Sequence, residues 1–157
     1  MKKRLTVGVL ALLFCGYGLA GTNIKNDIIG IWAMTPLETG RANVVEFKEN
    51  NVTYLYPFTC LRNGKKVISG TYYNGVTYDN EMERSTYSIS NDVISITFNG
   101  EKKPYILLRF KGVEKQRGKT ILKLSEVYGP IIGSTKTEFS YTKTDKIQPL
   151  CAQFFDN

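Results

Sequence analysis

The sequence predicts an all-β protein: an antiparallel up-and-down barrel of about eight to nine strands, with a β-sandwich as the alternative. Short segments rich in β-branched and aromatic residues recur at spacings of roughly 8–14 residues. Asn-Gly pairs and other turn residues separate these segments, so consecutive strands can pair as hairpins. After residue 20 no segment has the periodicity of an amphipathic helix. Sequential pairing favours the barrel, because closure removes exposed strand edges.

The strands follow from alternation and from the turns between them. The first clear hairpin joins "ANVVEFKEN" to "NNVTYLYPF" through the turn residues at 48–51. Val45 and Phe47 share one face of its first strand. One face of its second strand carries Val52, Tyr54, Tyr56 and Phe58. Further strands are predicted at 67–75, 85–90, 93–98, 104–113, 119–127 and 135–143.

The first 20 residues have the pattern of a secretory signal peptide. Basic residues at 2–4 precede an apolar run from Leu5 to about Phe14, and the small residues Gly18 and Ala20 suit cleavage after Ala20. We therefore expect a single domain over residues 21–157, periplasmic or secreted. The alternative is a lipoprotein anchored through Cys15. The apolar run is too short for a permanent span, and no second run of that length follows, so no integral membrane span is expected.

Charge and composition narrow the possible functions. The chain has 21 basic and 14 acidic residues; three basic residues leave with the leader, so the mature net charge is +4. That modest excess favours solubility over nucleic-acid binding.

The chain contains no histidine. This absence excludes Ser-His-Asp and Cys-His nucleophiles, and it removes the commonest zinc ligand and the usual general base. We expect no enzyme, no metal and no cofactor. A hydrolase that uses carboxylates only is a weaker alternative, and a cation site at Asp79, Glu81 and Glu83 is another.

Two cysteines remain after the leader, Cys60 and Cys151. In an exported protein such a pair predicts a disulfide, which would fix the C-terminal tail to the first third of the domain. Two unrelated buried thiols are the alternative.

The stretch "NDIIGIWAM" contains the single tryptophan of the chain, Trp32, two residues after Gly30. It resembles the Gly-x-Trp motif that begins the first strand of lipocalins and small bacterial lipocalin-like proteins. "ANVVEFKENNVTYLYPF" and "STYSISNDVISITF" look similar to hairpins of these proteins. The resemblance implies that Trp32 packs at the closed end of a barrel, where an arginine often covers it. The predicted last strand, "TKTEFSYTK", offers lysines and no arginine.

The resemblance implies a ligand cavity or binding rim and no catalysis. Side chains that can face such an interior are Val45, Phe47, Tyr54, Tyr56, Phe58, Tyr87 and Ile89, and the predicted ligand-binding set is Phe47, Tyr54, Tyr56, Phe58 and Tyr87. A plain apolar core of the same residues is the alternative. Because a buried tyrosine needs a partner for its hydroxyl, the tyrosines favour a partly polar interior.

The function predicted from the sequence is an exported, lipocalin-like binding protein for a small apolar or amphipathic ligand. The alternative is a periplasmic inhibitor or immunity protein that binds an envelope protein. Its contact loops would be "LRNGKKV" and "YDNEMER".

Overall fold

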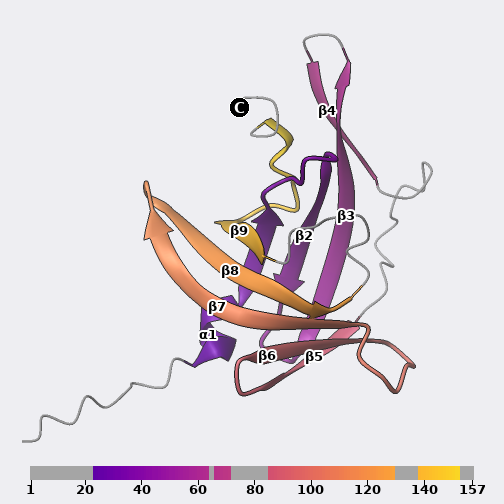
Figure 1. The fold of residues 1–157 in the computed structure, drawn as a ribbon, viewed down its shortest axis with the longest axis vertical. Coiled ribbons are helices and arrows are strands. Elements are labelled where there is room, and N and C mark those ends of the chain that lie inside the picture. Colours follow the sequence, from indigo (N-terminus) through magenta and orange to yellow (C-terminus); the bar gives the residue numbers. More distant parts are fainter. Residues whose placement is uncertain (1–22, 64–65, 72–84, 130–137, 153–157) are drawn as a thin grey trace, which may run out of the picture.

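The computed structural model describes residues 23–63, 66–71, 85–129 and 138–152. Their secondary structure is almost entirely antiparallel strand (Figure 1). The elements are α1 (Ile24–Ile28), β1 (Gly30–Met34), β2 (Arg41–Phe47), β3 (Val52–Asn63), β4 (Lys66–Thr71), β5 (Ser85–Ser90), β6 (Val93–Phe98), β7 (Ile106–Gln116), β8 (Lys119–Tyr128) and β9 (Glu138–Thr144). The sequence pattern did not predict helix α1. At five residues, α1 is too short to show a helical period in the sequence.

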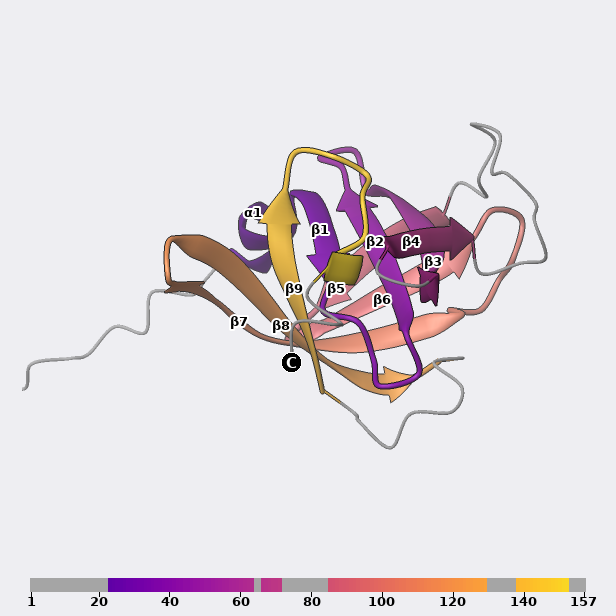
Figure 2. The ribbon, with the colours of Figure 1, turned by 90° about the horizontal axis from the view of Figure 1, so that it is seen from above.

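Eight strands close into a barrel, which confirms the predicted up-and-down fold and is compatible with a lipocalin-like fold (Figures 1 and 2). Neighbours around the ring are β1, β2, β3, β5, β6, β7, β8 and β9, and β9 pairs again with β1. Strand β4 stays outside the ring, because it pairs only with Phe58–Asn63 in the second half of β3. Between β3 and β5 the ring closes through two residue pairs, Val52 with Thr86 and Thr53 with Ser85.

Tight turns connect the strands where the sequence has turn residues. Asn51 follows β2, Asn91 joins β5 to β6, and both have a positive φ, 61° and 55° respectively. Asparagine tolerates this left-handed conformation better than most residues. The turn between β7 and β8 consists of Arg117 and Gly118, with φ of 49° and 77°. Two successive positive φ values in a two-residue loop define the type I′ turn that suits the twist of a hairpin.

The barrel interior is a single contiguous apolar cluster. Its buried members are Ile28, Trp32, Met34, Leu37, Val45, Phe47, Tyr87, Ile94, Ile96, Ile106, Leu108, Leu122, Leu124, Phe139 and Tyr141. Apart from Ile28 in α1 and Leu37 in the loop after β1, they come from alternate positions of the strands, as expected when one face of each strand points inward. Burying these side chains is the main source of stability of the fold.

Helix α1 and Trp32 close one end of the barrel. Trp32 is fully buried, and its indole N–H donates a hydrogen bond of 2.6 Å to the carbonyl oxygen of Ile28, the last residue of α1. Its direct partner on β9 is Lys143, whose Nζ lies 5.2 Å from the centre of the indole ring. A lysine therefore supplies the cation at the place where the resemblance implied an arginine.

Gly30 allows β9 to approach the start of β1. Its φ is +127°, which side chains with a Cβ rarely adopt, and a Cβ there would lie 3.1 Å from Cε of Lys143. The glycine and tryptophan of the Gly-x-Trp motif therefore have connected roles. Gly30 leaves space for the side chain of Lys143, and the indole ring of Trp32 contacts its ammonium group.

The C-terminal segment returns to the outside of β3 after β9. Cys60 and Cys151 form the predicted disulfide, with their Cα atoms 5.2 Å apart. The two half-cystines pack with buried Ala42 and partly buried Phe58 in a second, smaller apolar cluster. The prediction that the tail is fixed to the first third of the domain is confirmed.

Candidate functional site

Strand β3 presents the opposite face to the interior from the one expected. Residues paired across antiparallel strands project to the same side of the sheet. Phe47, which points into the barrel, pairs with Thr53, and Val45 pairs with Leu55. The partners of the predicted site residues point outward; Tyr54 pairs with Glu46, Tyr56 with Val44, and Phe58 with Ala42. The expectation that Tyr54, Tyr56 and Phe58 face the interior is therefore wrong.

The other two predicted site residues do lie inside the barrel. Phe47 and Tyr87 contact each other edge to face, with ring centres 5.2 Å apart and planes at 82°. The hydroxyl of Tyr87 donates a hydrogen bond of 2.8 Å to the carbonyl oxygen of Lys48, and burial raises its pKa. Because this hydroxyl already has a partner, Tyr87 and Phe47 act as core residues of the barrel in this structure.

The outward tyrosines form a small aromatic patch. Tyr54 and Tyr56 stack with ring centres 6.4 Å apart, and Nζ of Lys48 lies 4.9 Å from the centre of the Tyr54 ring. Lys48 is also 3.7 Å from the carboxylate of Glu46. Burial raises the pKa of Tyr56, and the charges of Glu46 and Tyr54 add to this rise. We call Glu46, Lys48, Tyr54 and Tyr56 the outer tyrosine patch.

A polar group of side chains lies inside the barrel at the end opposite Trp32. Arg41 and Asn43 occupy the inward positions of β2 that follow the alternation of Val45 and Phe47. Glu126 continues the inward positions of Leu122 and Leu124 on β8, and Tyr141 projects inward from β9. The group that we call the mouth cluster is Arg41, Asn43, Glu126 and Tyr141.

Two members of the mouth cluster have unusual environments. Burial raises the pKa of Tyr141 to about 12; a hydrogen bond from the Asn43 side chain opposes this rise and the charge of Glu126 adds to it. The amide nitrogen of Asn43 lies 3.5 Å from the sulfur of Met34. Its buried Oδ1 has no hydrogen-bond partner among the described residues. Buried polar atoms in native proteins normally have a partner, so this oxygen is unusual, as is Thr53 Oγ1, which also has no partner among the described residues.

The sequence analysis did not predict the mouth cluster, although the alternation along β2 points to two of its members. Extending the inward alternation from Phe47 and Val45 by two steps along β2 gives Asn43 and Arg41. Tyr141 and Glu126 lie on the two strands that close the ring, and no local pattern brings them to β2. Their proximity depends on closure of the barrel.

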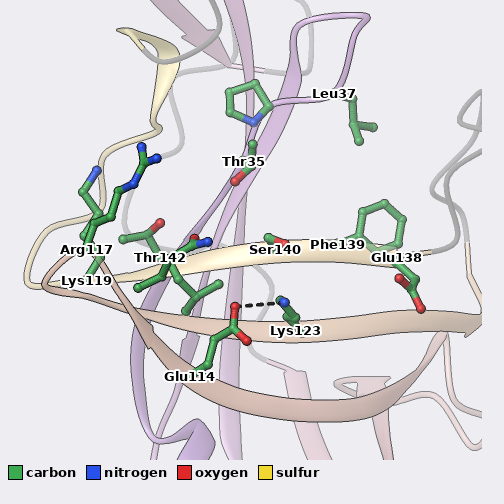
Figure 3. Close-up of a pocket in the computed structure, with 13 residues that line it drawn as sticks. Thr35, Leu37, Glu114, Arg117, Lys119, Lys123, Glu138, Phe139, Ser140 and Thr142 are labelled. Carbon is green, nitrogen blue, oxygen red and sulfur yellow. Dashed lines mark ion pairs between the residues drawn. The ribbon is translucent and has the colours of Figure 1, made fainter.

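A hollow lies on the outside of the barrel (Figure 3). It has a volume of about 530 Å³ and runs over the outer faces of β7, β8 and β9 up to the loop after β1. An ion pair of 2.9 Å between Glu114 and Lys123 lies within it. We call it the outer groove; its lining residues are Thr35, Pro36, Leu37, Glu114, Gln116, Arg117, Lys119, Ile121, Lys123, Glu138, Phe139, Ser140 and Thr142.

Among the described residues, neither the mouth cluster nor the outer groove has an arrangement typical of metal binding. Within the described ranges no three Cys, Asp or Glu residues converge as metal ligands. Asp79, Glu81 and Glu83 lie outside the described residues, as does most of the two loops expected to contact a partner. None of the helices in the described part of the chain is long and apolar enough to cross a membrane.

Comparison with known proteins gives no family for this chain. No protein-family model matches it, and neither the curated proteins nor the solved structures give a match. The described residues form a closed β-barrel that is compatible with ligand binding, with an apolar interior and polar side chains at one end.

Proposed function

We propose that this protein is an exported binding protein for a small amphipathic molecule, held with its apolar part in the barrel and its polar head at the mouth cluster. The observation that carries the proposal is the buried Oδ1 of Asn43, which has no partner among the described residues and lies next to the apolar interior. Leaving such an acceptor unsatisfied costs about 1–3 kcal/mol. A donor group on a bound ligand would remove that cost.

The surroundings of Asn43 suit a ligand of mixed polarity. Met34 beside it is flexible and polarisable, which favours contact with varied apolar groups. Tyr141 offers a hydroxyl at the same level, and Arg41 and Glu126 supply charges on the inward face. In ligand pockets a few polar groups commonly fix the orientation of a molecule bound mainly through apolar contacts. Tyr141 therefore takes the role that the sequence suggested for Tyr54 and Tyr56.

Export and binding without catalysis belong to the same proposal. The disulfide between Cys60 and Cys151 supports a periplasmic or secreted location, because such bonds persist in oxidising compartments. The pattern of residues 1–20 supports export by a signal peptide, with anchoring through Cys15 as the alternative. We infer a binding role without catalysis, since the chain lacks histidine, the usual general base.

Native mass spectrometry of the protein purified from its own host tests the proposal. We expect the wild type to retain a small molecule, and Asn43→Leu to reduce retention at least about tenfold because the polar head loses its acceptor. Thr53→Val is the matched control, because Thr53 Oγ1 is also buried without a partner in the described part of the chain but lies near the closed end. Equal retention by the two variants, or no bound molecule in the wild type, would contradict the proposal.

A second candidate function is inhibition of a protein partner in the cell envelope. The outer tyrosine patch favours it, because tyrosines at a surface are enriched in protein interfaces. The expected result is a single co-purifying protein that is lost in the Tyr54→Ala/Tyr56→Ala double variant and retained in Asn43→Leu.

A further inference from the structure

The outer groove has an uneven distribution of charge along its length. Arg117 and Lys119 lie together at one end, beside the tip of the β7–β8 hairpin, and Glu138 lies at the other end (Figure 3). Between them Lys123 is neutralised by its 2.9 Å ion pair with Glu114. Neither Arg117 nor Lys119 forms an ion pair with any other described residue. One end of the groove is therefore cationic and the other is anionic.

The cationic end includes a residue that its backbone conformation does not favour. Arg117 has a φ of 49° at the first position of a type I′ turn, where asparagine and glycine are the preferred residues. The other non-glycine residues with positive φ in the described chain are the asparagines Asn51 and Asn91. A strained backbone at one position is a reason to look for a function of its side chain. Here the side chain is a guanidinium, which binds carboxylates with two parallel hydrogen bonds.

The dimensions of the groove suit an extended chain. Along β8 it reaches from Lys119 to the level of Ser125, the partner of Glu138, which corresponds to roughly 20 Å or six extended residues. Its volume of about 530 Å³ lies within the range of sites that enclose a ligand. Ser140 and Thr142 of β9 and Ile121 of β8, the cross-strand partner of Thr142, line it between the two ends.

We propose that the outer groove binds an extended peptide segment of a protein partner, with acidic side chains at Arg117 and Lys119 and a basic side chain at Glu138. A small anion would need only the cationic end. A segment with charges at both ends uses the whole groove and fixes its direction, because reversing it places like charges together. This site lies outside the barrel and does not depend on a ligand at the mouth cluster.

Calorimetric titration with synthetic peptides tests the proposal. The probes are blocked six-residue peptides with two aspartates at one end, a lysine at the other and alternating valine and serine between, in both chain directions. A scrambled peptide of the same composition is the reference. We expect one direction to bind at least about tenfold more tightly than the scrambled peptide, and Arg117→Asn to remove that difference.

Arg117→Asn removes the guanidinium and places a preferred residue in the turn, so we expect the hairpin to stay folded in this variant. Lys115→Asn is the matched control, because it removes the same charge from the same hairpin but does not line the groove. Equal weakening by both variants would mean that only overall charge matters, and would overturn the proposal. So would tighter, Arg117-dependent binding of heparin or of phosphatidylglycerol vesicles, which would assign the site to another class of partner.

Discussion

The indole of Trp32 makes two polar contacts although none of its surface is exposed. Its N–H binds the last carbonyl of α1, and Lys143 lies over its ring from the neighbouring strand. Trp32 could be mistaken for an aromatic residue that stacks on a ligand. Its contacts instead connect α1 and β9 to β1. Its role is architectural, and the polar groups suited to a ligand lie at the other end.

Replacement of Lys143 tests the contact with the indole. Lys143→Met keeps the apolar stem and removes the charge, so we expect the free energy of unfolding to fall by about 0.5–1 kcal/mol. Lys143→Arg retains the charge and should stay within about 0.5 kcal/mol of the wild type. Urea unfolding at fixed ionic strength measures both changes. A methionine variant as stable as the wild type would show that the cation contributes nothing.

Tyr141 predicts a pH dependence of stability. Its pKa is 10.0 when unfolded and about 12 in the fold, so the unfolded state loses this proton first as the pH rises. Its stabilising contribution is complete below pH 10 and decreases by about 1.4 kcal/mol per pH unit between pH 10 and 12.

We expect Tyr141→Phe to remove this slope, measured as the difference between the urea stabilities of the two proteins at pH 9 to 12. The comparison cancels the smaller contributions of Tyr56 and Tyr87, whose pKa values are also raised. Parallel pH profiles for wild type and variant would argue against a buried, protonated Tyr141.

At the scale of elements, β3 shows where a sequence pattern is ambiguous. Both of its faces carry apolar side chains: Tyr54, Tyr56 and Phe58 outward, and Leu55 inward. The aromatic face looked more suitable for the interior, but the register with β2 puts Thr53 and Leu55 there. Only the pairing partner decides between two such faces, because a shift of one residue exchanges them.

A single substitution in the turn between β7 and β8 is expected to increase the stability of the protein. A residue such as arginine in the left-handed region is strained by about 1–2 kcal/mol, and asparagine removes part of that strain. Arg117→Asn should therefore raise the free energy of unfolding by about 0.5–1 kcal/mol. The converse change, Asn91→Ala in the β5–β6 turn, should lower it, and thermal unfolding measures both. A destabilised Arg117→Asn protein would mean that the arginine side chain stabilises the hairpin.

At the scale of the whole molecule, the disulfide should contribute a large part of the stability. Cys60 and Cys151 are 91 residues apart in the sequence, and closing a loop of this length removes unfolded-state entropy worth about 4–5 kcal/mol. We expect Cys60→Ala/Cys151→Ala to unfold at a correspondingly lower urea concentration. Reductant should destabilise the wild type and leave the double variant unchanged. Equal midpoints for oxidised and reduced wild type would contradict this.

The barrel could be predicted from the sequence because its strands are joined by short hairpins, each with its own local pattern. The disulfide could be predicted from the leader and the count of cysteines. The mouth cluster and the outer groove could not, because each combines side chains from strands that meet only when the ring closes. Asn43 and Tyr141, for example, are nearly a hundred positions apart in the chain. Turn residues therefore predict which strands pair as hairpins, whereas the mouth cluster and the outer groove form only when the barrel closes.

The strands around the barrel pair over very different lengths. Between β7 and β8 the ladder runs almost the full length of both strands, whereas β3 and β5 share two residue pairs, supported by the bond from Tyr87 N to Asn51 O. In native-state hydrogen exchange the amides of this short ladder should exchange through the lowest-energy opening of the barrel, well before those of β8 and β9. Such fluctuations would part the wall beside Phe47 and Tyr87, so exchange there also measures the free energy of an opening through which the proposed interior ligand could leave.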